Sequence, residues 1–344
     1  MELGTLFLVS HSALDARAVI SAYHENRDRR AVKIVSATAE NIEFFRDLEI
    51  PEEDLIALEY KCVNSAFRTP IGAFITAYQD KRMLDGLAAE MARDSRSKLR
   101  LHCYDNDFQS GYLASVLAGR VKLSLGDTVG VSRHQFSSID WLSLYFWKNL
   151  ILLFIVRWVF GPLFILAGSR NALLISFDLD RFAFDEWLEK RQLGTDVPEA
   201  LKLKLIEPGR DIVVLYADSY GIDAAKHGRV YSELFESLSA SDARIYLKLH
   251  PQTKDFPFPK SERIKFLPRH VPLEFIDLQQ VTTIIGVFGG AMLVEGGFQR
   301  ISIARLLYNT SSQLYADLAA QIDDLSGITF AESIYEISDL IEAD

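Results

Sequence analysis

Cysteine is scarce in this sequence, which limits the covalent and metal chemistry that we expect. The 344 residues include two cysteines, Cys62 and Cys103. Two thiols cannot form a disulfide framework, and the sequence around them lacks the spacing of metal ligands. We therefore expect a reducing compartment, two small buried thiols and no metal site.

Positive charge is also in short supply. The chain has 37 Lys and Arg against 47 Asp and Glu, a net charge of -10, and its pI is near 5.3. A general nucleic-acid binder needs a broad basic face to neutralise phosphates, so nucleic acid is excluded as a partner. An anionic ligand would have to meet a local basic pocket instead.

The first residues lack the features of an export signal. The segment MELGTLFLVSHSALD has no basic region, no small-residue cleavage site and an apolar run of only a strand's length. It predicts the first strand of a cytoplasmic domain.

Apolar residues make up 49% of the chain, enough to bury sizeable cores, and they occur as short runs that alternate with helical spacing. Strands are predicted at 6–9, 32–35, 55–58, 99–103, 121–125, 211–216, 243–249, 265–267, 282–286 and 302–306. Helices are predicted at 13–23, 70–91, 108–117 and 229–238, with another beginning at Ala291. This alternation predicts an α/β fold of two Rossmann-like domains facing across a cleft, the GT-B type, with ligands at the carboxyl ends of the strands.

Five parts are expected along the chain. They are an acceptor-side Rossmann-like domain at 1–140, a hydrophobic membrane-interface segment at 141–177, a helical linker at 178–209, a nucleotide-sugar-binding Rossmann-like domain at 210–330 and a C-terminal helix or tail at 331–344. Pro208 and Gly209 mark the boundary before the second α/β domain.

The segment at 141–177 holds no acidic residue and concentrates the apolar excess of the chain. Trp141, Trp147 and Trp158, mixed with Lys148 and Arg157, suit a helix that lies in a membrane interface over residues 141–168. Burial in the fold, a homodimer contact and a true membrane span are the alternatives. A span is disfavoured because a charged residue falls inside the run and a Gly-Pro pair breaks it.

Three segments of the second domain carry residues suited to binding a phosphate-linked ligand. A His-Pro pair at a strand end places an imidazole at the ligand edge, with lysines nearby, and a Gly-Gly turn before a helix leaves amide groups available to a phosphate. The segments are Lys248-Leu249-His250-Pro251, Val271-Pro272-Leu273-Glu274 and Gly289-Gly290-Ala291 leading to Glu295.

As a set, these segments resemble bacterial sialyltransferases of the two-domain GT-B type, namely the lipooligosaccharide sialyltransferase family and the capsular polysialyltransferases. That family shows a Lys-x-His-Pro segment, then an Ile/Val-Pro-x-Glu segment, then a Ser/Thr-containing turn entering a helix. This chain departs from the family where Gly289-Gly290 replaces the Ser/Thr pair, so backbone amides would serve there without hydroxyls.

The resemblance implies roles for individual residues. Asp127, in a Gly-Asp segment after the predicted strand at 121–125, corresponds to the catalytic base, with Asp105 and Asp107 as competitors on the acceptor side. His250 would act as donor or acid toward the leaving phosphate. The donor would be held by Lys248, Pro251, Glu274, Gly289, Gly290, Ala291, Glu295 and Ser219, while His11 and Ser12 would face the acceptor.

The implied activity is inverting transfer of an acidic sugar from a CMP-sugar to a surface glycan or glycolipid. The sugar would be sialic acid, a related nonulosonate or Kdo, with no cofactor beyond the CMP-sugar co-substrate and no metal. The alternatives are a UDP-sugar transferase or epimerase of the same fold, and a catalytically inactive membrane-associated glycan-assembly partner. The protein is expected in the cytoplasm, peripherally associated with the inner face of the cell membrane.

Overall fold

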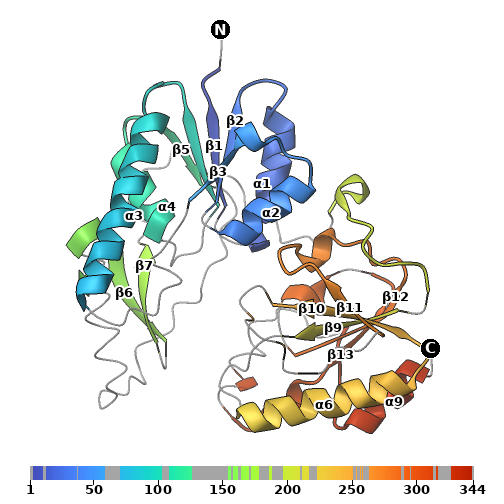
Figure 1. The fold of residues 1–344 in the computed structure, drawn as a ribbon. Helices are drawn as coiled ribbons and strands as arrows, with labels where there is room; N and C mark the ends of the chain where they lie inside the picture. Colours follow the sequence, from blue (N-terminus) through green and yellow to red (C-terminus); the bar gives the residue numbers. More distant parts are fainter. Residues whose placement is uncertain are drawn as a thin grey trace. The chain divides into compact units, whose positions relative to one another are not determined.

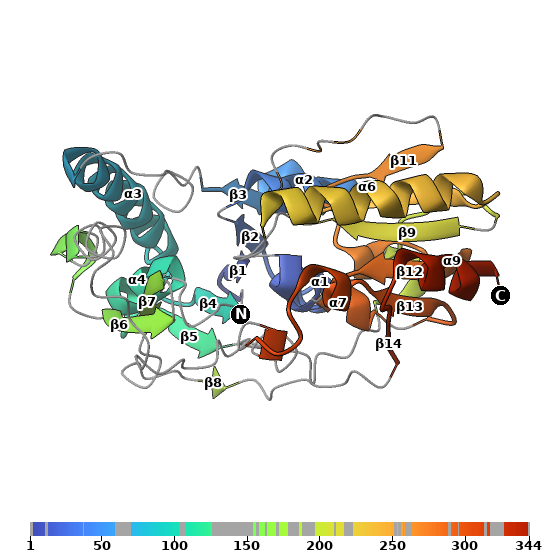
Figure 2. The same ribbon diagram turned by 90° about the horizontal axis from the view of Figure 1, so that it is seen from below.

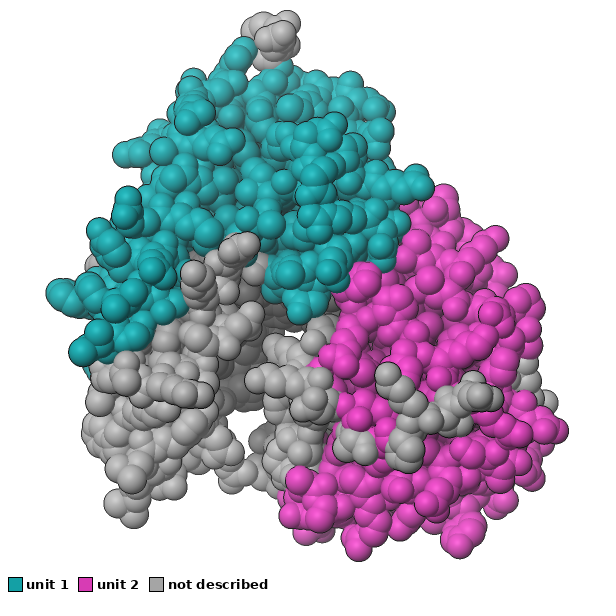
Figure 3. Space-filling model, in the orientation of Figure 1, with its two compact units in different colours: residues 1–192 teal, residues 193–344 magenta. Residues whose placement is uncertain are grey.

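The structure is a computed structural model of the whole chain and divides into two compact units, Met1–Gln192 (unit 1) and Leu193–Asp344 (unit 2) (Figure 3). The boundary between them falls inside the predicted linker at 178–209, while the finer five-part division stays a prediction. The residues that the structure describes are 3–10, 13–36, 38–58, 70–102, 108–125, 154–155, 158–161, 164–169, 172–177, 186–187, 197–209, 211–216, 223–250, 253, 256, 258, 263–287, 290–294, 296–312, 315–316 and 327–342.

Unit 1 is built on a parallel sheet of six strands in the order β3-β2-β1-β4-β5-β8 (Figure 2). Its first five strands form where the short apolar runs occur in the sequence, because a strand covered on both faces is apolar along its length. The strands are β1 (Leu6–Ser10), β2 (Val32–Ser36), β3 (Leu55–Ala57), β4 (Lys98–His102), β5 (Lys122–Leu125) and β8 (Glu186–Trp187).

Helices cover both faces of this sheet, α1 and α2 on one side and α3 and α4 on the other (Figure 1). Successive side chains of a strand point to opposite faces, and Phe7 and Val9 of β1 accordingly belong to the core under α3 and α4. The helices are α1 (Ala13–Asn26), α2 (Ala39–Asp47), α3 (Pro70–Met91) and α4 (Phe108–Leu117), with a short 3-10 helix η1 (Glu52–Asp54).

Unit 2 repeats this plan, with a parallel sheet in the order β11-β10-β9-β12-β13-β14. When the strands of each six-stranded sheet are numbered along the chain, both sheets follow the Rossmann order 3-2-1-4-5-6, so the predicted α/β fold of two Rossmann-like domains is confirmed. The strands are β9 (Asp211–Tyr216), β10 (Arg244–Leu249), β11 (Ile264–Leu267), β12 (Val281–Gly286), β13 (Gln299–Ser302) and β14 (Thr329–Phe330).

Two helices lie along one face of the unit 2 sheet, α6 (Ala224–Ala240) and α9 (Ile334–Glu342) (Figure 2). Val230, Leu234 and Leu238 of α6 join Ile337 and Ile341 of α9 in one buried core against the sheet. The remaining helices are short: α7 (Ala304–Leu307), η3 (Glu199–Leu201), η4 (Leu273–Phe275) and η5 (Gly290–Leu293).

The hydrophobic segment differs from the predicted interfacial helix. Helical residues occur at 154–155 and 158–160, and the chain then forms an antiparallel hairpin of β6 (Phe164–Ser169) and β7 (Ala172–Phe177). The helix cannot continue through Gly161, whose φ is +103°, into a proline, which lacks the N–H that a helix requires. Within the described residues, no helix is long and apolar enough to cross a membrane.

Three further predictions are corrected. The strand predicted at 302–306 is the end of β13 followed by α7, because Ser302 turns the chain: its hydroxyl accepts from the Ala304 N–H at 3.2 Å, as in a local serine turn. The linker expected to be helical holds β8 and η3 in its described part. Nor does an α-helix begin at Ala291, where the structure has only η5.

Candidate functional site

The carboxyl edge of the unit 2 sheet, where its parallel strands end, is the expected ligand edge of this topology. β9 lies between β10 and β12, and Val214 pairs with Leu247 on one side and Ile285 on the other. The ends of β10 and β12 are therefore level and about 10 Å apart. The Lys-x-His-Pro segment begins at the end of β10.

His250 is the first residue beyond β10. Its backbone N–H donates to the Tyr216 carbonyl at 2.8 Å, which extends the ladder between β9 and β10 by one residue. Its own carbonyl accepts from the Thr253 N–H at 2.9 Å, closing a four-residue turn. The residue is exposed at this edge, and its role toward a ligand stays a prediction.

Lys248 lies beneath this turn and is 8% exposed. Its Nζ donates to the carbonyl of Arg269 at 2.9 Å and to that of Leu249 at 3.3 Å. Burial lowers the pKa of Lys248 to about 8, the charge of Glu274 opposes this shift, and the charge of Arg269 adds to it. An ammonium has three donors, and two of those of Lys248 hold the end of β10 to the loop that contains Arg269.

Arg269 completes a connection that the sequence did not predict. Its Nη1 donates to the carbonyl of Thr253 at 2.6 Å, while the residue itself is exposed. Thr253 is 1% exposed, and its Oγ1 has no hydrogen-bond partner among the residues that the structure describes. Buried hydroxyls are normally paired, so this one places an additional polar atom near the end of β10.

Glu274 is the middle residue of η4, which begins directly after Pro272, and its side chain is half-buried. Its charge raises the pKa of Lys248 against the effect of burial, although the two residues belong to different motif segments. Hydrogen bonds thus link Lys248 and His250 with Arg269 and Thr253, two residues that sequence reasoning missed, while the binding role of the predicted set stays a prediction. In the sequence, Arg269 and Thr253 are simply polar residues between two predicted strands. Ordinary surface loops have the same composition, so nothing distinguished these two residues.

Gly290 and Ala291 begin η5 rather than the predicted α-helix, while their role toward a phosphate stays a prediction. The next glycine pair, Gly296-Gly297, follows shortly, and so few residues cannot nucleate a stable α-helix. Packing holds η5 instead: Met292 is 1% exposed, and its Sδ would lie 2.8 Å from a Cβ placed on Gly286.

Several predicted site residues lie outside the described part of the chain, and their roles stay predictions. In unit 2 these are Ser219, Pro251, Gly289 and Glu295; in unit 1 they are His11, Ser12, Asp105, Asp107 and Asp127. In unit 1 they follow strands β1, β4 and β5 in the sequence.

The carboxyl edge of the unit 1 sheet has a buried polar cluster that the sequence analysis missed. The Ser10 hydroxyl donates to Asp15 Oδ1 at 2.8 Å and accepts from Asn41 Nδ2 at 3.3 Å. Ser36, which pairs with Ser10 in the sheet, is 1% exposed, and its Oγ has no hydrogen-bond partner in the described parts of the chain. The signal was the shared ending of two apolar strands, LFLVS and VKIVS.

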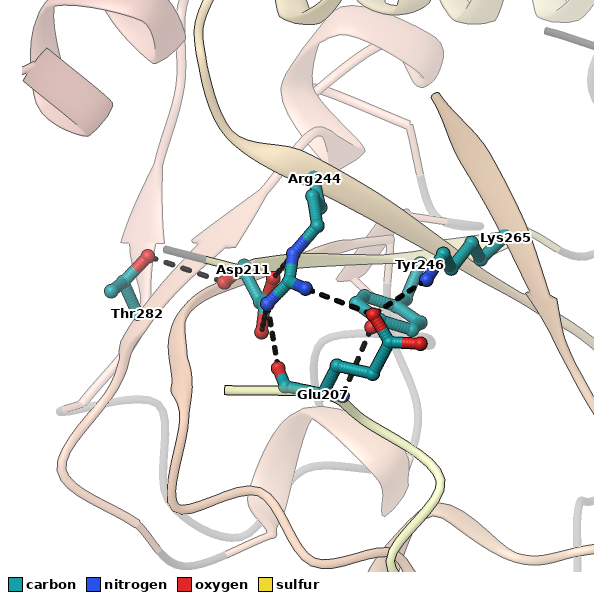
Figure 4. Close-up of polar contacts among 6 residues, drawn as sticks. All are labelled: Glu207, Asp211, Arg244, Tyr246, Lys265 and Thr282. Atoms are coloured by element: carbon teal, nitrogen blue, oxygen red, sulfur yellow. Dashed lines mark hydrogen bonds and ion pairs between the residues drawn. The ribbon is translucent and has the colours of Figure 1, made fainter. Parts of the chain in front are cut away.

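The opposite, amino edge of the unit 2 sheet holds a different kind of network (Figure 4). Asp211 is fully buried and receives two bonds from Arg244, Nε to Oδ1 at 2.8 Å and Nη2 to Oδ2 at 3.0 Å. Arg244 also binds Glu207, which receives Lys265 Nζ at 2.8 Å. Thr282 Oγ1 donates to the Asp211 carbonyl at 3.2 Å.

No protein-family profile matches the chain, and no curated protein matches it either. Among solved structures, UDP-GlcNAc 2-epimerase from Methanocaldococcus jannaschii is similar at 11% identity and TM-score 0.47, over 98% of this chain and 92% of that one. The S. aureus MnaA-UDP co-structure is similar at 9% identity and TM-score 0.48, over 99% and 88%. Arabidopsis thaliana UGT89C1 complexed with UDP-L-rhamnose is similar at 11% identity and TM-score 0.47, over 99% and 90%.

Proposed function

We propose that this protein is a glycosyltransferase that holds a nucleotide-sugar donor at the carboxyl edge of unit 2. The observation that supports the proposal is that the loop before the second motif segment is bonded to the first segment and to the residues just after it: Lys248 donates to the Arg269 carbonyl, and Arg269 in turn donates to the Thr253 carbonyl. This region combines two cations, a carboxylate and an exposed histidine on an otherwise acidic chain, the local basic site that an anionic donor requires.

Each group has a role in the proposed transfer. Arg269 and the third donor of Lys248 bind the donor phosphate, and Glu274 accepts hydrogen bonds from the nucleoside. An acceptor hydroxyl loses its proton to Asp127 as its oxygen attacks the anomeric carbon. The bond from that carbon to the phosphate oxygen breaks, and His250 donates to the phosphate as charge develops there, a contribution that can reach about 3 kcal/mol.

Two donors are proposed for this site. The match of the segments at 248–251 and 271–274 to the sialyltransferase family favours a CMP-linked acidic sugar. A UDP-sugar, used by a transferase or an epimerase, is the second candidate, because η5 and the glycine pair before it lack the hydroxyls and the α-helix of that family's donor site.

The acceptor in this proposal is a glycan carried by a lipid. Association with the inner face of the cell membrane through residues 141–168 would bring the enzyme to that acceptor. Within this segment, Phe160 is buried and its ring packs edge-on against Tyr112, with 5.3 Å between the ring centroids. Trp158, in contrast, is 78% exposed. The segment is thus anchored in unit 1 while it presents an aromatic side chain to its surroundings.

A nucleotide panel on the full chain tests the proposal. We expect CMP to raise the melting temperature, with a smaller rise for CDP, UDP and GDP, and we expect Lys248→Met to weaken this response. Lys265→Met, at the amino edge, is the matched control and should respond like the wild type. A response to UDP alone would favour the second candidate, and no response to any nucleotide would contradict both and favour an inactive partner protein.

Transfer itself is tested with His250→Ala. We expect this variant to bind the nucleotide and to lose most transfer, measured as release of the free nucleotide in the presence of acceptor. Undiminished transfer would remove His250 from the mechanism. Full transfer by Asp127→Asn would move the base to Asp105 or Asp107.

A further inference from the structure

The outer face of α3 carries large apolar side chains that the fold does not bury. Ile71 is 73% exposed, Ile75 50% and Tyr78 51%, and Phe74 is also exposed. The opposite face of the helix supplies Leu84 and other residues to the core of unit 1. A surface helix normally presents polar residues outward, so the first turns of α3 are apolar on the side where water is expected.

Trp158 extends this surface from a distant part of the sequence. The centroid of its ring lies 5.6 Å from that of Phe74, and the Phe74 ring stacks on Tyr78 with a centroid distance of 6.3 Å. We call Ile71, Phe74, Ile75, Tyr78 and Trp158 the apolar face. Because two separate chain segments build it, it is a contiguous surface of unit 1 rather than a scatter of single exposed residues.

The charge distribution indicates what covers the apolar face. The two segments that contribute to it, 60–79 and 141–177, contain no Asp or Glu, although the whole chain has 47. They contain instead Lys61, Arg68, Lys148, Arg157 and Arg170. On α3 itself, exposed Arg82 follows Ile71, Ile75 and Tyr78 at helical spacing, on the same side of the helix.

This composition fits an anionic lipid surface better than a second copy of the chain. A symmetric contact through this side of α3 would bring the exposed Arg82 side chains of the two copies close together, and like charges repel. Aromatic rings with neighbouring Lys and Arg match the headgroup layer of a bilayer, where the rings reach below the headgroups and the cations meet lipid phosphates.

We propose that the apolar face docks the protein on an anionic phospholipid bilayer, with α3 supplying a contact that residues 141–168 alone do not provide. This deepens the membrane association proposed above and is independent of the nucleotide chemistry. The bilayer contact is peripheral: the exposed side chains of α3 and Trp158 enter the interface, while the buried face of the helix remains in the core of unit 1.

Sedimentation of the full chain with vesicles tests this inference. We expect binding to vesicles of phosphatidylglycerol and phosphatidylcholine, and weaker binding to phosphatidylcholine alone or at high salt. The double variant Ile71→Ser/Ile75→Ser should bind about tenfold or more weakly, because two aliphatic side chains no longer enter the lipid. Tyr335→Ser, which removes an 85% exposed aromatic of α9, is the matched control and should bind like the wild type.

The outcomes separate docking from the proposed function. Equal vesicle binding by wild type and double variant, or no binding by the wild type, would overturn the inference even if the nucleotide panel succeeds. A wild-type dimer that the double variant dissociates, measured by analytical ultracentrifugation without lipid, would also overturn it and assign the face to self-association. If no nucleotide raises the melting temperature but the vesicles still bind the protein, the proposed transferase function is contradicted and the docking inference stands.

Discussion

The two edges of the unit 2 sheet differ in how their buried polar groups are paired. At the amino edge, buried Asp211 meets Arg244 through two bonds, and Glu207 and Lys265 complete the network (Figure 4). At the carboxyl edge, Lys248 is buried against carbonyl groups with a lowered pKa. Thr253 there buries a hydroxyl that has no partner among the described residues.

The difference lies in how charge is paired at the two edges, and it agrees with the proposal that the carboxyl edge holds the ligand. Paired charges stabilise the sheet, whereas a desolvated cation lowers its stability unless a bound ligand offsets the cost. The topology assigns ligands to the same carboxyl edge on independent grounds. Substitutions at matched positions of the two edges can therefore break or sharpen the comparison.

The largest effect is expected for Asp211→Ala at the amino edge. The change removes a fully buried acceptor and leaves Arg244 without two bonds, so we expect a loss of about 3 kcal/mol in the free energy of unfolding. This is the low end for a buried pair, because the Arg244 side chain is 32% exposed. Urea denaturation measures the loss, and a change below that of a surface substitution would contradict the structural role of the network.

A smaller loss is expected for Gly286→Ala at the end of β12. The new methyl group would lie 2.8 Å from Met292 Sδ and 3.2 Å from Leu215 Cβ, and such overpacking costs about 2 kcal/mol. Gly228→Ala is the matched control: nothing lies within 4 Å of its Cβ, and in the interior of α6 alanine should stabilise by about 0.5 kcal/mol. Thermal melts of both variants measure this contrast, and equal melting temperatures would show that Met292 does not hold η5 on the sheet.

Lys248→Met should change how stability depends on pH. Because the pKa of Lys248 falls to about 8 in the folded state, above that pH the folded chain binds fewer protons than the unfolded chain. Wild-type stability should therefore rise relative to the variant, by about 1.5 kcal/mol between about pH 7.5 and 9.5. Urea denaturation at several pH values measures it, and parallel curves would mean that Lys248 is not buried as a cation.

The smallest changes in stability are expected from a threonine at each edge. Thr253→Val removes a hydroxyl without a partner among the described residues, so the stability should stay unchanged or rise slightly while nucleotide affinity falls. Thr282→Val removes the bond to the Asp211 carbonyl, so the free energy of unfolding should fall by about 1 kcal/mol while the nucleotide affinity stays unchanged. Denaturation and nucleotide titration of both variants measure the pair; the same pattern in both would erase the distinction between the edges.

Local sequence was enough to locate most strands and the main helices. The apolar run at 211–216 and the helix at 70–91 agree with β9 and α3 residue for residue, because an apolar run of that length has few alternatives within a parallel sheet. Prediction failed where short elements depend on their neighbours. The hairpin of β6 and β7 pairs two apolar runs that resemble a helix in isolation, and η5 is held by packing of Met292 rather than by helix propensity.

The sequence by itself determined the two α/β domains, the carboxyl edge and the positions of Lys248, His250 and Glu274, since periodicity and motif spacing are local properties of the chain. Only the tertiary structure decided that Lys248 faces inward to the Arg269 carbonyl, that Arg269 and Thr253 belong to the same region, and that α3 and Trp158 share one exposed face. These are relations between residues far apart in the chain, and packing and burial fix them only when the sheets and helices come together.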